Sequence, residues 1–340
     1  MDLMTAGGIL AERAPVPDLL VTAGMRRKIS SSARALASQG GVDSAFARGM
    51  AEHAIAEHAS AANAQHYELP PEFFGLILGP NRKYSSCLYV TGAETLAQAE
   101  DIALGETAAH AELADGQDIL ELGCGWGSLS LWTAEHYPNA RITAVSNSAP
   151  QRCYIEERAR QRMIGNLTVI TADMNDFAID RRFDRIVSVE MFEHMANWRG
   201  LLTRARGWLK EDGRLFLHVF SHANTPYRFD HGDENDWIAQ HFFTGGIMPS
   251  HGLIRQFPDL FTVEQEWRWS GEHYRRTAMD WLANFDARQK EIMPILRNVY
   301  GRDAAMWRRR WRMFFLATAE MFGFEGGDVW GVSHYRLKGA

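Results

Sequence analysis

From residue 117 to residue 220, the spacing of the hydrophobic residues alternates between the one typical of strands and the one typical of helices. Short apolar runs such as DILELGC, RITAVSN and LTVITAD are typical of buried strands, and longer segments of helical character, such as APQRCYIEERARQRM, separate them. Strands joined by helices of this length need right-handed crossovers, which build a parallel sheet covered on both faces. The pattern predicts a doubly wound α/β fold with a mostly parallel sheet.

The hydrophobic pattern outside this region divides the rest of the chain. Residues 1–90 form an N-terminal helical extension that ends in a covering loop, HYELPPEFFGLILGPNRKYSSC, where prolines and glycines interrupt apolar runs. The parallel core takes residues 91–220. A lid and helical insertion take residues 221–327, with one core strand near 261–268, and residues 328–340 form the last core strand.

Charge and composition narrow the class of protein. The formal net charge is −6, and the 23% of charged residues are spread along the chain, which is typical of a soluble globular protein and argues against a nucleic-acid partner. One local exception is MWRRRWRM, residues 306–313. This segment is either a solvated helix face or a contact for an acidic partner or lipid headgroups.

Cysteine usage and the N-terminal sequence suggest a compartment. Cys87, Cys124 and Cys153 are too few for a disulfide framework, and no CxxC pair indicates a metal site. The first twenty residues carry an early acid, no basic leader and only short apolar runs. We expect a cytoplasmic protein, and a homodimer is a possible assembly.

A glycine-rich loop, ELGCGWGSLS, follows the first predicted strand and opens a helix, so its backbone can approach a ligand closely. Its glycines form G-x-G-x-G, whereas the dinucleotide fingerprint needs a third glycine where Ser128 stands. About twenty residues on, where a ribose-binding acid is expected for NAD, the chain has Ser146, Asn147 and Gln151. NAD is therefore disfavoured.

The E-x-G-x-G-x-G pattern resembles the S-adenosylmethionine (SAM) loop of class I methyltransferases, which implies a seven-stranded Rossmann-like sheet, SAM as cofactor and S-adenosylhomocysteine as product. In that class an acid or amide after the third strand lies at the adenine, and Asp173 fits this position. The cofactor-binding residues expected at this loop and at the following strand ends are Glu121, Gly123, Gly125, Gly127, Ser146, Asn147, Gln151 and Asp173, and the closer family resemblance described next adds Tyr84 and Ser85.

A closer resemblance runs from about residue 60 to the end. The segments VEMFEHM, FFTGGIMPS and GEHYRRTAMDWL look like the cyclopropane-fatty-acid synthase superfamily. One branch of that superfamily methylenates lipid olefins, and a coclaurine N-methyltransferase-like branch methylates amines. The lipid branch usually has a proline before the paired glycines of the lid, whereas this chain has Thr244 there and Met248-Pro249 after them, as the amine branch does.

The lipid branch also holds a bicarbonate base with a cysteine, a glutamate, a histidine and a tyrosine. Glu193, His218 and Tyr274 match three of these positions, and Ser86 takes the place of the cysteine, with Cys87 displaced by one residue. Because the carbocation route needs a base to remove a methyl proton, the loss of one ligand weakens the lipid interpretation without abolishing it.

The segment VEMFEHM leaves the fourth strand of the core, so Glu190, Glu193 and His194 are predicted to converge on one pocket. By resemblance they match the acids and the histidine that the amine branch uses. Our hypothesis is that Glu190 anchors the ammonium, His194 acts as general base and Glu193 orients the histidine or the amine. The alternative is that the acids only cap the next helix.

Six further residues are candidates for the substrate pocket. Aromatic rings in the lid and near the end of the chain could line a pocket for an aromatic amine, or could simply pack the lid on the core. A buried histidine in LFLHVFSH fits a site and a satisfied core position equally well. The candidates are His218, Trp237, Phe242, Phe243, Tyr274 and Trp330.

Together these observations predict a SAM-dependent N-methyltransferase acting on a small aromatic or cyclic amine, of the tetrahydroisoquinoline or arylalkylamine type. The first alternative is a cyclopropane-fatty-acyl-phospholipid synthase or lipid methyltransferase with bicarbonate as base, and only this alternative implies membrane contact. The second is a protein that binds SAM without catalysis. We expect neither a metal nor a nucleic-acid partner.

Overall fold

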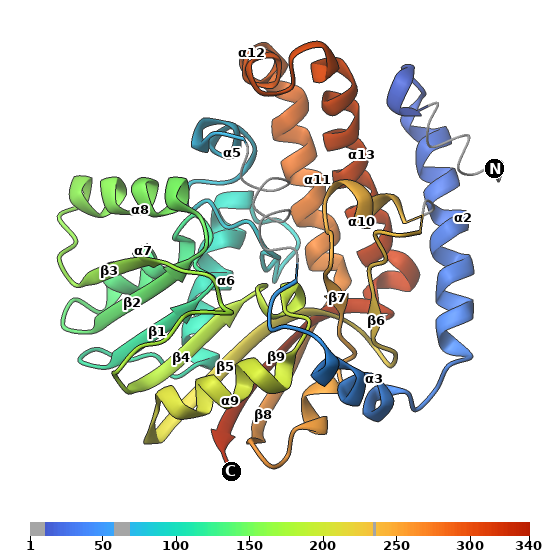
Figure 1. Cartoon of the computed structure of the whole chain (residues 1–340). Helices are drawn as coiled ribbons and strands as arrows, with labels where there is room; N and C mark the ends of the chain where they lie inside the picture. Colours follow the sequence, from blue (N-terminus) through green and yellow to red (C-terminus); the bar gives the residue numbers. More distant parts are fainter. Residues whose placement is uncertain (1–10, 58–68, 234–235) are drawn as a thin grey trace.

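The computed structural model describes residues 11–57, 69–233 and 236–340. Its centre is a seven-stranded sheet of order β3-β2-β1-β4-β5-β9-β8, shown in Figure 1. The first five strands in sequence pair in parallel, and β9 is antiparallel to both neighbours. The predicted fold class is therefore confirmed. The strands are β1 (Asp118–Leu122), β2 (Arg141–Ser146), β3 (Leu167–Thr171), β4 (Phe183–Val189), β5 (Leu209–His222), β8 (Phe261–Ser270) and β9 (Trp330–Gly339).

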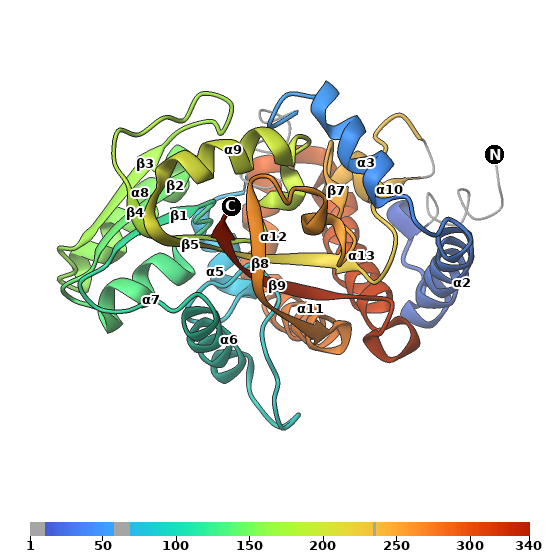
Figure 2. The same cartoon turned by 90° about the horizontal axis from the view of Figure 1, so that it is seen from below.

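Helices cover both faces of the sheet, as the view from below in Figure 2 shows. Side chains of β2 alternate accordingly: Ile142 and Ala144 pack toward one layer of helices, and Val145 packs into the core of the other face. The first layer contains α6 (Leu96–His110), α7 (Ser128–His136) and α8 (Ala149–Gln161), and the second contains α9 (Trp198–Trp208) and α3 (Asp43–Gly49).

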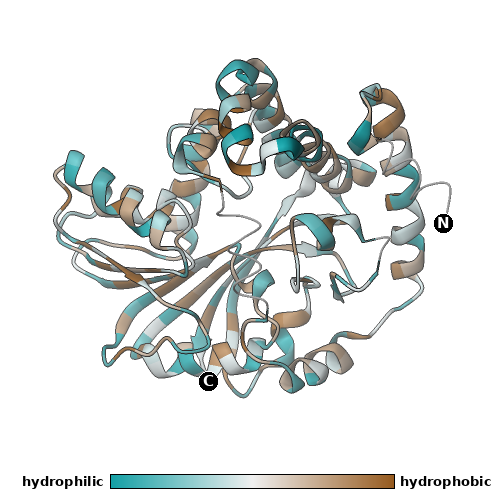
Figure 3. Ribbon diagram, turned by 45° about the horizontal axis from the view of Figure 1, so that its top comes forward, coloured by the Kyte–Doolittle hydropathy of each residue, from teal (hydrophilic) through white to brown (hydrophobic). Residues whose placement is uncertain are grey.

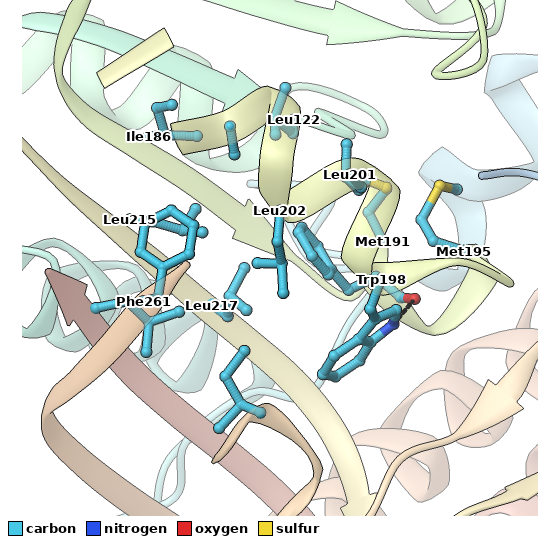
Figure 4. Packing of buried hydrophobic residues seen from close by; sticks show 14 of the residues in the cluster. Leu122, Ile186, Met191, Met195, Trp198, Leu201, Leu202, Leu215, Leu217 and Phe261 are labelled. Carbon is cyan, nitrogen blue, oxygen red and sulfur yellow. Dashed lines mark hydrogen bonds between the residues drawn. The ribbon is translucent and has the colours of Figure 1, made fainter. Parts of the chain in front are cut away.

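The core beneath α9 fixes the position of the turn that follows β4. Trp198, Leu201 and Leu202 lie on one face of the helix, because residues three and four apart share a face, and they pack against the sheet (Figure 4). The indole nitrogen of Trp198 donates a hydrogen bond of 2.8 Å to the carbonyl of Phe192. Through this bond the helix holds the VEMFEHM turn in place.

A group of helices and a small lid lie beyond the carboxyl ends of the parallel strands (Figure 1). Their aromatic side chains form a second core, in which Trp311 and Phe315 are fully buried. The helices are α5 (Pro71–Ile77), α11 (Gly271–Ala287), α12 (Gln289–Tyr300) and α13 (Ala304–Phe322), and the lid consists of β6 (Tyr227–Arg228), α10 (Trp237–His241) and β7 (Ile247–Met248). Short 3-10 turns are η1 (Met50–Glu52), η2 (Phe192–His194), η3 (Leu253–Gln256), η4 (Gly301–Asp303) and η5 (Phe324–Gly327).

The arginine- and tryptophan-rich segment of α13 is largely occupied within the chain. Arg310 forms an ion pair of 2.7 Å with Glu12, and Arg312 pairs with Asp18 at 2.9 Å and Asp286 at 2.7 Å. Asp18 begins the N-terminal helix α2 (Asp18–Ala37), which packs along α13 (Figure 1). The segment is thus mainly an internal interface, and within the described residues no helix is long and apolar enough to span a membrane.

The prediction of a loop over residues 66–87 is wrong for Pro71–Ile77, which forms the helix α5. Residues 66–68 of the predicted loop lie outside the described residues. Proline is well accommodated at the first position of a helix, where its missing N–H costs nothing. Phe73, Phe74 and Ile77 then fill the aromatic core, and all three are fully buried. Figure 3 shows long stretches of hydrophobic residues, in brown, on the central strands, whereas the outer helix α8 carries many hydrophilic residues, in teal.

Candidate active site

A cavity opens where β1, β2 and β4 end and the helical group begins. The glycine loop after β1 forms part of its wall, and three of its glycines have positive φ angles: +81° at Gly123, +49° at Gly125 and +79° at Gly127. A Cβ on Gly123 would lie 2.4 Å from Met191, whereas a Cβ on Gly125 would meet nothing within 4 Å. The loop is therefore tight on its protein side and open at Gly125.

The cavity wall carries buried polar atoms that suit a polar ligand. Trp126 Nε1, Ser128 Oγ and Gln151 Nε2 line it and have no hydrogen-bond partner among the described residues. Because buried polar groups in folded proteins normally find partners, these atoms mark where a polar ligand would bind. The SAM expected from the sequence fits this set, which offers two N–H donors and a hydroxyl near the glycine loop.

Nine of the ten residues expected to bind the cofactor line this cavity, and Gly127 turns the chain into α7 behind it. Ser146 donates a hydrogen bond of 2.7 Å to the Gln151 side chain, which holds its amide in place. Glu121 accepts a short hydrogen bond from Ser130, and burial raises its pKa to about 7. The nine are Tyr84, Ser85, Glu121, Gly123, Gly125, Ser146, Asn147, Gln151 and Asp173.

Glu190 lies at the centre of the far wall. It follows β4 with a φ of +48°, a left-handed conformation that few non-glycine residues adopt and that is common at functional sites. Its carboxylate accepts a hydrogen bond of 2.9 Å from the Ser86 N–H and one of 2.7 Å from the Tyr274 hydroxyl, and it lies 3.2 Å from His218 Nε2. Burial nevertheless raises the pKa of Glu190.

Glu193 and His194 belong to the 3-10 turn η2 that follows. Glu193 is fully buried; its Oε1 accepts a hydrogen bond of 2.6 Å from the Phe220 N–H, and its Oε2 has no hydrogen-bond partner among the described residues. Burial, together with the charge of Glu190, raises the pKa of Glu193 well above its usual value. His194 lines the cavity, and its ring lies 4.4 Å from the ring of Phe243.

The charge of a buried lysine acts on Glu190. Lys83 lines the cavity with 2% of its surface exposed and donates hydrogen bonds to Ser85 Oγ at 2.6 Å and to the Ser86 carbonyl at 2.5 Å. Burial lowers its pKa, while the charge of Glu190 acts in the opposite direction. The site therefore combines a hydrogen-bonded carboxylate at Glu190, a second acid that retains its proton more firmly at Glu193, and a nearby amine.

Aromatic side chains line the cavity, but only some of the six residues predicted for the substrate pocket are among them. Of the six candidates, Phe243 and Tyr274 line the cavity, and His218 stands behind Glu190. Trp237 and Phe242 lie outside the cavity wall because they pack in the helical core, where Phe242 stacks on Phe314 at 4.5 Å. Trp330 is buried and donates to Tyr227 OH, so it too lies outside the wall.

Sequence reasoning missed other residues of the wall. The missed aromatic side chains are Trp126, Phe220, Phe229, Trp281, Phe314 and Phe322. The spacing of Phe314, Thr318 and Phe322 at i, i+4 and i+8 places all three on one face of α13, and this periodicity was a usable signal. Lys83 gave a weaker signal as a lysine between apolar runs. For the other missed residues, nothing in the local sequence indicates that they face the cavity.

The residues matched to a bicarbonate site are arranged differently from that expectation. His218 and Tyr274 bond to Glu190 rather than to Glu193. Ser86, at the cysteine position, contributes its backbone N–H to the same carboxylate. The Cys87 side chain is fully buried, and burial raises its pKa to about 12. The donors expected for bicarbonate thus converge on a carboxylate of the protein itself.

Comparison with known proteins identifies the family of this chain. The family model described as mycolic acid cyclopropane synthetase matches residues 55–332. The chain belongs to this family. It is 36% identical over 289 residues to an (S)-coclaurine N-methyltransferase of Thalictrum flavum subsp. glaucum, covering 84% of this chain and 80% of that protein.

Two further comparisons show how far the similarity extends to the amine branch and to the lipid branch of the family. A crystal structure of coclaurine N-methyltransferase bound to N-methylheliamine and S-adenosylhomocysteine superposes with a TM-score of 0.93 at 33% identity and covers 97% of both chains. The cyclopropane-fatty-acyl-phospholipid synthase of Escherichia coli (strain K12) is 31% identical over 230 residues, which is 67% of this chain and 57% of that protein. This chain is a SAM-dependent methyltransferase, and its similarity to the N-methyltransferase extends over more of the chain.

The neighbours Phe242 and Phe243 provide a test of the cavity wall. Phe242→Leu should lower the free energy of unfolding by about 1–3 kcal/mol, because it leaves a void in the core, while KM for the methyl acceptor changes little. Phe243→Leu should leave the melting temperature nearly unchanged and raise that KM roughly tenfold, since an aromatic contact in the cavity is lost. Thermal melts and steady-state kinetics of both variants measure this, and the reverse pattern would contradict the placement of the two rings.

Proposed function

We propose that this protein transfers the methyl group of SAM to the nitrogen of a small aromatic or cyclic amine, of the tetrahydroisoquinoline or arylalkylamine type. The observation that carries the proposal is a single cavity that joins the glycine loop to Glu190 and His194 and is walled by aromatic rings. The similarity to an (S)-coclaurine N-methyltransferase over most of the chain supports it.

The charges of the cavity suit an amine that arrives as a cation. An aliphatic amine has a pKa near that of lysine, about 10, so it is mostly protonated at neutral pH. Glu190 offers it a buried carboxylate whose position is fixed by three hydrogen-bonding groups. A cation in a site of low polarity is attracted both by such a carboxylate and by the faces of aromatic rings.

Methylation then requires that the nitrogen lose a proton and expose its lone pair. His194 lines the cavity and is the residue that we assign as general base, with Glu190 as the anchor of the ammonium. Glu193 lies behind the cavity and orients the turn that carries His194, since its carboxyl group is held by the backbone of β5. Bound SAM supplies an electrophilic methyl group, and the chain holds the nitrogen in line with it.

The remaining roles of the site are also proposals. The ten residues expected to bind the cofactor are assigned to SAM, on the evidence of the cavity that nine of them share. Phe243 and Tyr274 are assigned to the walls of the amine pocket. A location in the cytoplasm and a homodimer stay predictions from the sequence.

The direct test is mass spectrometry of products after incubation with SAM and, separately, tetrahydroisoquinolines, arylalkylamines and vesicles of unsaturated phospholipid. We expect the mass of a methyl group to be gained on the nitrogen of one or more amines and no change in the lipids. A methylene added to an acyl chain would replace the proposal with the lipid alternative. Tight SAM binding with no product from any arm would favour a binding protein.

The assignment of His194 predicts a specific pH dependence. In His194→Ala, kcat/KM should fall by about 10²–10⁴-fold at neutral pH and recover as pH rises toward the amine's pKa, because free amine then needs no base. Glu190→Gln should raise KM most strongly between the raised pKa of Glu190 and the pKa of the amine, because only in that range is the carboxylate ionised while the substrate is cationic. His136→Ala, on the exposed surface of α7, is the matched control. Wild-type kcat/KM in His194→Ala at every pH would refute the assignment.

A further inference from the structure

Three histidines connect Glu190 to the protein surface. His218 on β5 lies opposite His334 on β9 in the antiparallel register, and His110 is the last residue of α6. His218 Nε2 lies 3.2 Å from Glu190 Oε1, and its Nδ1 lies 2.8 Å from His334 Nε2. His334 Nδ1 lies 2.9 Å from His110 Nδ1, and His110 Nε2 lies 3.3 Å from a carboxylate oxygen of Glu106.

The path begins at the cavity and ends in solvent. Both ring nitrogens of every histidine are used, so each ring contacts the next group in the series and nothing is skipped. His218 and His334 are fully buried, and His110 has 8% of its surface exposed. The Glu106 side chain is 46% exposed, so this carboxylate exchanges protons with water.

Aromatic side chains enclose the three rings and hold their orientations. Trp267 stacks on His110 with ring centroids 3.8 Å apart, and Trp269 lies 4.3 Å from His334. Both tryptophans come from β8, the strand next to β9. Such packing keeps water out of the series and prevents the rings from turning over, since a close-packed interior offers no room for a flip.

We infer that His218, His334 and His110 form a proton relay that carries protons between Glu190 in the cavity and Glu106 at the surface. The inference rests on the proposed function, because a cation entering the cavity requires Glu190 to be ionised and a departing product removes that requirement. A substrate in the cavity blocks the direct route from Glu190 to solvent, and the relay supplies a second route.

Each outward transfer leaves all three rings neutral. Protonated Glu190 gives its proton to His218 Nε2, while the proton on His218 Nδ1 passes to His334 Nε2. The proton on His334 Nδ1 passes to His110 Nδ1, and the proton on His110 Nε2 passes to the Glu106 carboxylate. One proton enters and one leaves each ring, so every histidine changes tautomer and Glu190 becomes a carboxylate.

Rings that cannot flip make the relay alternate between two directions. After one outward transfer each ring carries its proton on the other nitrogen, and a second outward transfer is impossible until a proton has moved inward. This matches a catalytic cycle in which Glu190 loses a proton when an ammonium binds and regains one when the product leaves. One transfer in each direction per turnover returns the series to its starting state.

The charges around the series favour neutral rings. Burial lowers the pKa of His218 and of His334 well below the ordinary value, and the nearby Lys83 ammonium lowers both further. At the outer end burial lowers the pKa of His110, while Glu106 acts against this shift and Arg336 acts with it. At the inner end the titratable groups that face Glu190 are Lys83, Tyr274 and Glu193. Transfer by exchange of tautomers therefore suits the site better than transfer through a charged ring.

Nitrogen NMR of the histidine rings tests the relay without any amine. Chemical shifts distinguish the two neutral tautomers, and the single variants His110→Gln, His218→Gln and His334→Gln assign the signals. We expect all three rings to stay neutral and to change tautomer together, with one midpoint, as Glu190 is titrated. Glu190→Gln should abolish the change in all three, including the distant His110. Tautomers that stay fixed, or that change at different pH values, would overturn the relay.

A rate measurement tests its use. Protein loaded with S-adenosylhomocysteine is mixed with tetrahydroisoquinoline in weak buffer containing an indicator dye, and proton release is followed by stopped flow. His334→Gln should release the same number of protons at a rate at least about tenfold lower, because an amide bonds both neighbours but does not exchange a proton between its nitrogen and oxygen. His136→Gln should behave as wild type, and a thermal melt checks that His334→Gln folds.

The two tests separate the relay from the proposed function. Equal rates in wild type and His334→Gln would show that protons leave by another route, even where the amine binds. If tetrahydroisoquinoline does not bind, the substrate proposal fails, and the NMR titration still decides whether the three rings exchange protons as a unit.

Discussion

The carboxylate of Glu190 is the point on which this site depends. It is held in a left-handed turn by a backbone N–H from the segment before α6, a hydroxyl from α11 and an imidazole from β5. A buried anion is costly unless hydrogen bonds satisfy it. All three elements must therefore be correctly positioned for Glu190 to be ionised. Under the proposed function, a cationic amine in the cavity completes this set of partners.

The fold around this turn serves to keep it fixed. The parallel strands bring the glycine loop and the β4 turn to one edge, and α9 locks the turn through the bond from Trp198 to the Phe192 carbonyl. The helices α11 and α13 close the other side with aromatic rings. In this arrangement the antiparallel strand β9 has a second use, because its register places His334 against His218 and extends the polar network away from the cavity.

Much of this could be predicted from the sequence, and the limits have a physical cause. Strand and helix periods are local, so the order of the core elements and the position of Glu190 after β4 were accessible. The glycine loop could also be recognised from the local sequence, and nine of the ten residues expected to bind the cofactor line one cavity. Long-range packing could not be predicted from the sequence. The neighbours Phe242 and Phe243 have the same side chain, yet Phe242 is buried in the core and Phe243 lines the cavity.

The pairing of distant residues was the other limit. His218 was equally compatible with a core and a site position; in the structure it is fully buried and contacts Glu190 from behind the cavity wall. His110 and His334 are 224 positions apart, and no local pattern links them. Glu190 itself was expected to face the cavity, but its three hydrogen-bonding groups come from separate segments that only the tertiary fold brings together.

If Glu190 gives the cavity its affinity for a cationic amine, calorimetric titration should detect it. Protein loaded with S-adenosylhomocysteine is titrated with tetrahydroisoquinoline and with isochroman, its neutral oxygen analogue of the same shape. In the wild type the cation should bind at least about tenfold more tightly than isochroman, a difference of about 1.4 kcal/mol, and Glu190→Gln should remove this preference. Equal affinity for the two compounds, or a preference that survives Glu190→Gln, would contradict it.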